Sequence, residues 1–293
     1  MRSRSVRLAA ERIEDRMSTD MKPIPRSMLF TPATKASYFG KAADVDADAV
    51  ILDLEDSVAT AAKDQARRAA LNYLCSERPS GVQTALRINS PATVAGWQDL
   101  TALLQSPCNL DFVVIPEAES ADVAGLVKSL LAQARKAARV VVIYESARAV
   151  THVGALLDPR LVGAVMLGGD DLSADLGAAV NAEVTVHARN VLLTHAAAVA
   201  IPVIDSPFFD ISDDVGLEHA ARRAVAEGFA GKAAVHPSQI PVINAAFRPD
   251  DREIDWAREV IEASRAGVGA VAGLMVDEAV ARHARRILQS VDH

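Results

Sequence analysis

Short apolar runs recur along the chain from Pro23 onward, and stretches with a helical spacing of apolar residues separate them. The apolar runs are rich in β-branched residues and lack regular polar alternation, which is typical of parallel strands covered on both faces. We expect eight strands, at residues 27–30, 49–54, 84–88, 112–115, 140–144, 164–167, 203–205 and 233–235. Helices are expected between them, including residues 61–74, 121–138, 185–200 and 214–227.

Strands that alternate with helices in this way predict an α/β fold. Eight such units over about 210 residues favour a TIM (β/α)8 barrel over an open sheet. A doubly wound sheet is the alternative, and it would have a glycine-rich phosphate turn after the first strand. Residues 31–34 read Thr-Pro-Ala-Thr and do not form such a turn, so the barrel is the predicted fold.

The two ends of the chain differ from the repeating part. Residues 1–22 are rich in arginine and also contain acids, so we expect a disordered tail rather than a signal or transit peptide. Residues 23–250 would form the barrel. Residues 251–293 are expected to form a helical arm or lid, with a helix from residue 252, a flexible glycine-rich stretch at 267–273 and a helix at 276–288. A plain C-terminal packing helix is an equally good interpretation of this pattern.

Composition narrows the functional classes. Half of the residues are apolar, which is enough for a large core, and the formal net charge of −7 is spread along the chain, so nucleic acid is not an expected partner. Apolar runs stay well short of the roughly 20 residues of a membrane span. The two cysteines, Cys75 and Cys108, lack metal-binding spacing, so neither a zinc site nor a disulfide is expected, and a cytoplasmic location fits.

Two acidic residues follow two of the predicted strands. Glu145 comes directly after residues 140–144, and Asp171 follows residues 164–167 and two glycines. Either acid alone could simply cap the next helix. Because the carboxyl ends of barrel strands share one mouth, the two together predict a hard, oxygen-rich site suited to Mg²⁺. Such a site would polarise an anionic carbonyl substrate.

Further polar residues end the second and third strands. Arg87 has the planar guanidinium that binds a carboxylate with two hydrogen bonds, although a buried ion pair is an even alternative. Asp53, Glu55 and Asp56 place three carboxylates within four residues. One of them could be a base with a raised pKa, or they could pair with Lys and Arg. Ser57 is expected to cap the next helix.

Eight short runs carry a family resemblance. They are RSMLFTPA (26–33), DAVILDLEDSV (48–58), LRINSP (86–91), VVIPEAES (113–120), IYESARAV (143–150), GGDDL (168–172), VIDSPFFD (203–210) and GFAGKAAVHPSQI (228–240). Together, over residues 25–290, they resemble the citrate lyase β-subunit-like proteins of the HpcH/HpaI aldolase superfamily, which includes malyl-CoA and citramalyl-CoA lyases. The resemblance implies a Mg²⁺-dependent carbon–carbon lyase on a TIM barrel that assembles as a homotrimer or hexamer.

The resemblance also implies residue roles. Matched by position, Glu145 and Asp171 would hold Mg²⁺, and Arg87 would clamp a substrate carboxylate. The other implied site residues are Asp53 and Glu55 near the reacting atoms, Phe30, Pro32 and Lys41 at the acyl-CoA substrate, and Asp277 of the run GLMVDEA (273–279), which would reach a neighbouring subunit's site.

Three positions depart from the family pattern. Glu117 stands where the family has a lysine, which replaces a positive charge by a negative one beside an anionic site. Ala149 replaces a glycine, and Ala279 replaces a proline. The first change bears on the substrate or the proton path, and the other two are milder.

Four functions remain open at this stage. The run GLMVDEA favours an acyl-CoA lyase that cleaves malyl-CoA or citramalyl-CoA. A citrate lyase β subunit would instead act on a citryl thioester carried by a partner protein. A barrel whose catalysis has decayed, with Glu117 as its hint, would only bind a ligand such as CoA, and an unrelated metal-dependent aldolase would act on free acids without CoA.

Overall fold

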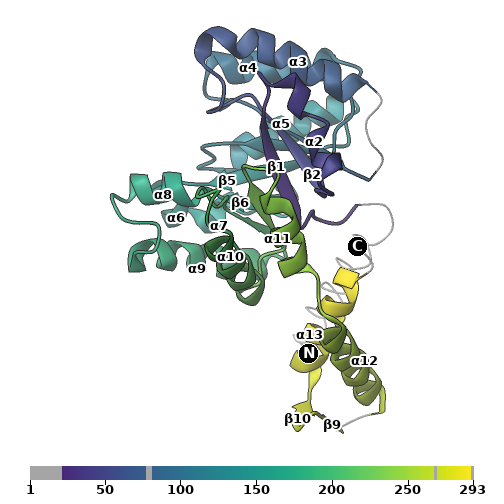
Figure 1. Cartoon of the computed structure of the whole chain (residues 1–293). Helices are drawn as coiled ribbons and strands as arrows, with labels where there is room; N and C mark the ends of the chain where they lie inside the picture. Colours follow the sequence, from purple (N-terminus) through teal and green to yellow (C-terminus); the bar gives the residue numbers. More distant parts are fainter. Residues whose placement is uncertain (1–21, 77–80, 267–268, 292–293) are drawn as a thin grey trace.

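Eight parallel strands close into a barrel in the computed structural model, which describes residues 22–76, 81–266 and 269–291. Each strand pairs with the next one along the chain, and the last pairs with the first. Figure 1 shows β1, β2, β5 and β6 of this barrel with helices around them. The strands are β1 (Ser27–Pro32), β2 (Ala49–Asp53), β3 (Gln83–Arg87), β4 (Phe112–Ile115), β5 (Arg139–Tyr144), β6 (Ala164–Leu167), β7 (Val203–Asp205) and β8 (Gly231–Ala234). The predicted (β/α)8 barrel is therefore confirmed.

Helices surround the barrel. They are α2 (Lys41–Asp44), α3 (Lys63–Cys75), α4 (Val94–Gln105), α5 (Ala121–Gln133), α6 (Ala147–Thr151), α7 (Val153–Leu156), α8 (Gly169–Asp175), α9 (Glu183–Ala198), α10 (Asp214–Glu227) and α11 (Gln239–Phe247), with short 3-10 turns η1 (Ala36–Tyr38) and η2 (Thr60–Ala62). Side-chain caps start several of them, for example the Thr93 hydroxyl, which accepts from the Gly96 N–H at 3.1 Å. Helix α5 ends earlier than expected because Arg135 adopts a positive φ of 56°.

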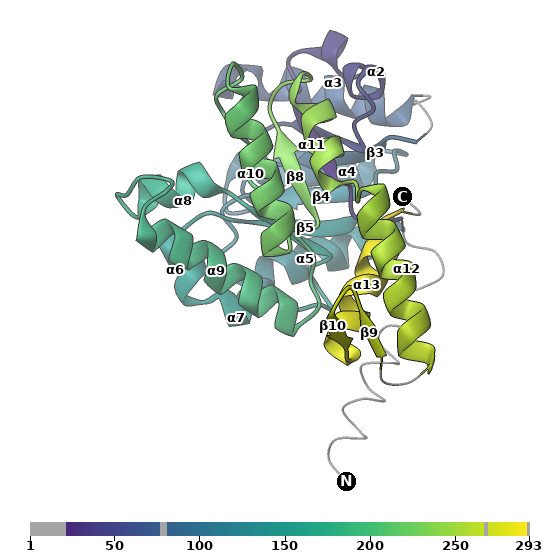
Figure 2. The ribbon, with the colours of Figure 1, turned by 60° about the horizontal axis from the view of Figure 1, so that its bottom comes forward.

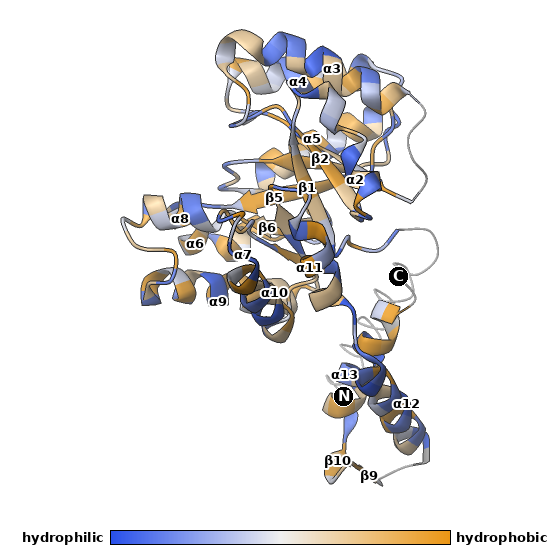
Figure 3. Ribbon diagram, in the orientation of Figure 1, coloured by the Kyte–Doolittle hydropathy of each residue, from blue (hydrophilic) through white to orange (hydrophobic). Residues whose placement is uncertain are grey.

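The strands are buried on both faces, as their sequence indicates. Along β5, Val141 and Ile143 belong to the apolar cluster inside the barrel, whereas Val140 and Val142 pack in the layer between strands and helices. Figure 3 shows the hydrophobic colouring of β2 and β5 at the centre of the molecule. This double burial explains why the strands read as continuous apolar runs.

The C-terminal segment forms an arm that projects from the barrel beyond α11 (Figures 1 and 2). It consists of α12 (Asp251–Ala266), β9 (Gly269–Val271), β10 (Leu274–Val276) and α13 (Glu278–Val291). Its buried residues form a small apolar cluster of their own, namely Ala257, Val260, Val271, Val276 and Ala284.

The prediction of a flexible stretch at residues 267–273 is wrong for residues 269–273, which the structure describes. Residues 269–276 form an antiparallel hairpin, β9 with β10. Ala272 and Gly273 adopt positive φ values of 49° and 81°, which is the backbone of a tight hairpin turn. The last helix accordingly begins at Glu278 rather than at residue 276, because Val276 ends β10 and Asp277 caps the helix.

The two cysteines correct another expectation. Cys75, at the end of α3, and Cys108, just before β4, form a disulfide with a Cα–Cα distance of 4.5 Å. The residues are 33 positions apart, so their spacing along the chain carries no sign of the pairing. They meet because α3 returns its C-terminal end to the face of the barrel where β4 begins.

The predicted tail, residues 1–22, lies outside the described residues except for Lys22, whose ammonium is 2.9 Å from the Asp111 carboxylate. The division into a barrel at 23–250 and an arm at 251–293 stays a prediction, as does the action of the arm as a lid. Within residues 22–291, as far as they are described, none of the helices has the length and apolar character to cross a membrane.

Candidate active site

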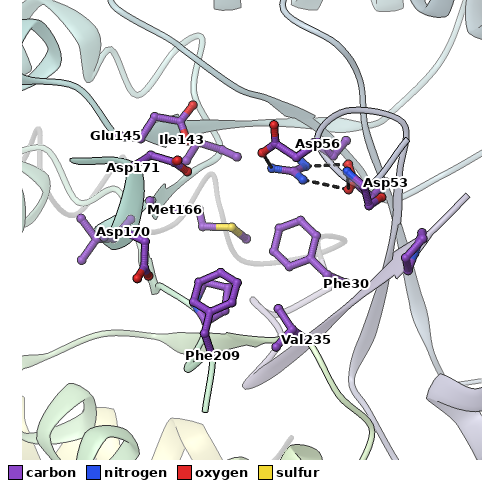
Figure 4. Close-up of a pocket in the computed structure, with 17 residues that line it drawn as sticks. Phe30, Asp53, Asp56, Ile143, Glu145, Met166, Asp170, Asp171, Phe209 and Val235 are labelled. Atoms are coloured by element: carbon purple, nitrogen blue, oxygen red, sulfur yellow. Dashed lines mark hydrogen bonds and ion pairs between the residues drawn. The ribbon is translucent and has the colours of Figure 1, made fainter. Parts of the chain in front are cut away.

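A cavity of about 370 Å³ opens at the carboxyl ends of the barrel strands. Residues from the ends of β1, β2, β3, β5, β6, β7 and β8 line it. They are Phe30, Pro32, Asp53, Asp56, Ser57, Arg87, Ile143, Glu145, Met166, Leu167, Gly168, Gly169, Asp170, Asp171, Pro207, Phe209 and Val235 (Figure 4). The strands of such a barrel place catalytic groups at this end.

Arg87 ends β3 and is held by Asp53, which ends β2 in the register that pairs the two residues. Its Nε and Nη2 donate to the two carboxylate oxygens of Asp53 at 2.7 and 2.8 Å. Burial acts to raise the pKa of Asp53, but the hydrogen bonds and charge of Arg87 outweigh it, so this pKa lies below its ordinary value. The guanidinium also lies over the Phe30 ring, 4.9 Å from its centre.

Two more acids lie against the same arginine. Arg87 Nη1 is 2.9 Å from Glu55 Oε2 and 3.3 Å from Asp56 Oδ2. Burial raises the pKa of Glu55 to about 8, with the Arg87 charge opposing this and the Asp56 carboxylate adding to it. Burial therefore favours the protonated form of Glu55, whereas Arg87 favours the ionised form of Asp53.

Glu145 follows β5 and is clamped from two sides. Its Oε1 accepts the backbone N–H of Glu117 at 2.5 Å, and Glu117 has a positive φ of 52°. A methyl group on Gly168 would lie 2.6 Å from Glu145 Cβ and 2.8 Å from Oε2, so only glycine fits there. Burial raises the pKa of Glu145 to about 7, opposed by the Glu117 N–H and reinforced by the charge of Asp171.

Asp171 lies in the first turn of α8, two residues after the glycines that follow β6. Burial raises the pKa of this carboxyl, and the charges of Asp56 and Glu117 add to the effect, against that of Arg87. Asp170 also lines the cavity, and burial and the charge of Asp171 raise its pKa. Because these carboxylates repel one another in a half-buried site, a divalent cation between them would remove the repulsion.

The donor set fits Mg²⁺ because it consists of carboxylate oxygens. Among the described residues, no group of three or more His, Cys, Asp and Glu side chains forms a ready-made metal cage. Mg²⁺ usually takes one or two carboxylates and completes its shell with water and substrate oxygens, so Glu145 and Asp171 suffice.

Apolar side chains form the rest of the wall. Ile143 and Met166 lie one residue before the ends of β5 and β6, inside the barrel, and Phe30, Phe209 and Val235 face them across the cavity (Figure 4). Phe209 is more than half exposed although it lines the cavity. The wall therefore offers an apolar surface next to a charged floor.

The structure brings together most of the residues that the sequence analysis singles out. Seven of them line the cavity, namely Phe30, Pro32, Asp53, Asp56, Arg87, Glu145 and Asp171, and Glu55 contacts Arg87 at its edge. Lys41 does not line the cavity, and its ammonium lies 4.3 Å from the centre of the Tyr38 ring. Asp277 lies in the arm, where its Oδ1 accepts from the Val280 N–H and caps α13.

Other residues of the cavity have no role at the site in the sequence analysis, which expects Ser57 only as a helix cap. Ser57 caps no helix, because the next turn starts at Thr60; its backbone N–H donates to Asp53 Oδ2 at 3.2 Å instead. Met166 and Phe209 belong to apolar runs that do not distinguish a cavity wall from a core. Gly168 carries a usable signal, since paired glycines after a strand permit close approach of a neighbouring side chain.

Comparison with known proteins gives the family. The family model described as HpcH/HpaI aldolase/citrate lyase matches residues 26–237. A citrate lyase subunit beta-like protein of Mycobacterium tuberculosis is 38% identical over 275 residues, which cover 89% of this chain and 93% of that protein. An L-malyl-CoA/beta-methylmalyl-CoA lyase of Rhodobacter capsulatus is 32% identical over 302 residues, which cover 91% of this chain and 94% of that enzyme.

The fold comparison agrees. The crystal structure of CitE from Mycobacterium tuberculosis in complex with magnesium, acetoacetate and coenzyme A superimposes with a TM-score of 0.77 at 35% sequence identity. The match covers 92% of this chain and 98% of CitE. The barrel, the acidic strand ends and these matches lead to one assignment: the chain belongs to the HpcH/HpaI aldolase/citrate lyase family.

Proposed function

We propose that the chain is a Mg²⁺-dependent lyase that cleaves a 3-hydroxyacyl-CoA thioester of the malyl-CoA or citramalyl-CoA type into acetyl-CoA and a 2-keto acid. That it is a carbon–carbon lyase follows from its family and its relatives. The observation that carries the rest is the meeting of Glu145, Asp171 and Arg87 in one cavity. Similarity to a malyl-CoA lyase and to a CitE structure with magnesium and coenzyme A supports it.

The proposal gives each group a role. Glu145 and Asp171 would hold Mg²⁺, which, when bound, polarises the hydroxyl and carboxylate oxygens of the substrate. Arg87 would bind a substrate carboxylate, and Asp53 would keep the guanidinium in place through its two hydrogen bonds. Phe30 and Pro32 would line the acyl part, and Lys41 would meet the phosphates of CoA.

The reaction is a retro-Claisen cleavage. A base takes the proton of the substrate hydroxyl, the carbonyl of the keto acid forms, and the electron pair of the broken carbon–carbon bond passes to the thioester as an enolate. An acid then protonates that enolate to give acetyl-CoA. Asp277 of a neighbouring chain is the proposed acid, and Glu55, whose protonated form burial favours, is the second candidate.

A citrate lyase β subunit is the alternative, and the 38% identity to a citrate lyase subunit beta-like protein favours it. Such a subunit would cleave a citryl thioester borne by a carrier. Its site would need the same metal and arginine, so the cavity does not separate the two functions. Turnover of a free CoA thioester does, because a citrate lyase β subunit would need the citryl thioester borne by its carrier.

The test is cleavage of malyl-CoA and citramalyl-CoA, followed by release of glyoxylate or pyruvate, with Mg²⁺ and with EDTA. The proposal expects metal-dependent keto acid that disappears in Glu145→Ala. Glu218→Ala is the matched control, because Glu218 is an exposed acid on α10 paired with Arg222 and is absent from the cavity. Turnover of neither thioester, with CoA still bound, favours a carrier-borne substrate, and loss of both CoA and Mg²⁺ binding favours a decayed barrel.

A further inference from the structure

Arg87 is the one cationic side chain among the residues that line the described cavity, and it faces three carboxyl groups of its own chain. A carboxylate substrate that binds Arg87 must therefore compete with at least one of them. The three acids differ in the length and number of their contacts with Arg87. These differences identify the acid that a substrate carboxylate would displace. The argument rests on the proposed function, since it takes Arg87 as the substrate clamp.

Asp53 is the permanent partner. Its two oxygens accept from Nε and Nη2, and its side chain is 3% exposed. It also accepts the backbone N–H groups of Glu55 and Ser57, so it cannot leave without breaking the loop that follows β2. A buried, bidentate pair of this kind is costly to separate.

Nη1 is the nitrogen of Arg87 that Asp53 does not bind, and it makes a long, weak hydrogen bond to Asp56. The hydrogen bond from Nη1 goes to Asp56 Oδ2 at 3.3 Å, and the Asp56 side chain is 67% exposed. Glu55 Oε2 lies closer to Nη1, yet within the described residues it has no hydrogen-bond partner. Burial raises the pKa of Glu55 and so favours its neutral form, and Asp56 is the acid that accepts the hydrogen bond from Nη1.

The position of Asp56 matches that of an incoming substrate group. Asp56 lines the cavity, and Figure 4 shows it on the side of the cluster toward Glu145 and Asp171, with Asp53 on the far side. Its charge also raises the pKa of both Glu145 and Asp171, which places it within electrostatic reach of the metal site. A substrate carboxylate bridging the metal and Arg87 would approach along the same side.

We propose that Asp56 is an internal competitor for Arg87. Its carboxylate occupies the place on Nη1 that a substrate carboxylate takes, and it swings into solvent when the substrate binds. Asp56 thereby sets the affinity of the site for carboxylates and protects Arg87 from weak anions. It acts through Arg87 and is a positioning residue rather than a catalytic one.

The test is calorimetric binding of pyruvate, the keto acid expected from citramalyl-CoA, to the full-length protein in saturating Mg²⁺. Asp56→Asn should bind pyruvate roughly twofold to fivefold more tightly, the range expected when an exposed ion pair no longer competes. The same variant should bind Mg²⁺ alone no more tightly than the wild type, because a negative charge near the metal site is lost. Pyruvamide, which has no carboxylate, should show no gain.

Asp64→Asn is the matched control. Asp64 is 69% exposed and lies 2.6 Å from Arg67 Nη1, so it reproduces the exposed acid–arginine pair outside the cavity, and its loss should leave pyruvate binding unchanged. The gain should also disappear in Asp56→Asn combined with Arg87→Gln. Wild-type binding of pyruvate with no gain, or a loss, in Asp56→Asn overturns the competitor proposal alone. A wild type that binds neither pyruvate nor glyoxylate with Mg²⁺ overturns the proposed function together with it.

Discussion

At the scale of single residues, the site is built from carboxylates whose surroundings give them different roles. Asp53 is buried yet ionised because Arg87 gives it two hydrogen bonds and a charge. Glu55, two residues later, has a buried Oε2 that makes no hydrogen bond within the described part of the chain, and burial raises the pKa of this carboxyl to about 8. Two side chains that carry the same carboxyl group thus take different roles, one as an anchor for Arg87 and one as a candidate proton donor.

The Asp53–Arg87 pair predicts a pH dependence of stability. Because the folded-state pKa of Asp53 lies below its unfolded value, its contribution is present above about pH 4 and is lost as the pH falls through the folded-state pKa. Asp53→Asn should lower the free energy of unfolding at pH 7 by about 3 kcal/mol, since it leaves a buried guanidinium with weaker partners. Denaturation from pH 7 to pH 2 should show a smaller acid-dependent loss in the variant. A parallel pH dependence in variant and wild type would contradict this account.

The close contact between Gly168 and Glu145 predicts that a larger residue at position 168 weakens Mg²⁺ binding. In Gly168→Ala the new methyl group would lie 2.8 Å from Glu145 Oε2, so the carboxylate must move. We expect Mg²⁺ affinity to fall roughly tenfold to a hundredfold, as when the support of a metal ligand is lost. Gly40→Ala, with no atom within 4 Å of its new methyl group, is the control in the same calorimetric titration. Equal Mg²⁺ affinity in the two variants would argue against Glu145 as a ligand.

Residue types at strand ends are predictable from the sequence because the strand period and the barrel bring those ends to one mouth. That logic finds Arg87, Glu145 and Asp171. It does not reach Asp56 as a competitor, because the choice between Glu55 and Asp56 depends on side-chain angles. The sequence likewise does not place Asp277, since the arm carries it away from the cavity of its own chain (Figure 1).

At the scale of elements, the eight strands and their order follow from the apolar runs, with ends shifted by one or two residues. The hairpin of β9 and β10 does not, because glycine is equally typical of flexible linkers and of tight turns. The positive φ of Ala272 belongs to an ordinary residue and carries no sequence signal. The local sequence pattern also does not predict that Cys75 pairs with Cys108, because this pairing depends on how α3 packs against the barrel.

The disulfide predicts a stability effect that is separable from activity. It closes a loop of 33 positions, for which loop entropy gives about 3–4 kcal/mol. Thermal unfolding with and without reductant, and of Cys75→Ala with Cys108→Ala, should show the same loss of stability. Lyase activity at 25 °C should stay unchanged, because the bond lies at the opposite end of the barrel from the cavity. A stability independent of reductant would show that the pair contributes nothing to the folded state.

At the scale of the whole molecule, the arm separates a proposed acid from the site it would serve. Asp277 is exposed and caps α13, at the foot of the hairpin. Leu274 and Met275 on that hairpin are also largely exposed. An arm with its own apolar cluster can reach a neighbouring chain without disturbing the barrel, which fits the expected trimer or hexamer.

A shared site predicts complementation. Glu145→Ala and Asp277→Ala should each be inactive, and co-assembly of the two variants should restore activity in about one site in four, because each site then draws from two chains. The measurement is lyase activity after the variants are unfolded and refolded together, beside each variant refolded alone. Full activity of Asp277→Ala alone would place Asp277 outside the reaction and leave Glu55 as the proton donor, whereas no recovery from two inactive variants would contradict the shared site.

The most direct test of the central claim is an anomalous difference map from crystals grown with Mn²⁺ and pyruvate. The account predicts a metal peak next to the carboxylates of Glu145 and Asp171. The pyruvate carboxylate should contact Arg87, and the Asp56 side chain should be turned away from Arg87. A cavity without a metal peak, or a peak that involves neither Glu145 nor Asp171, would contradict the account.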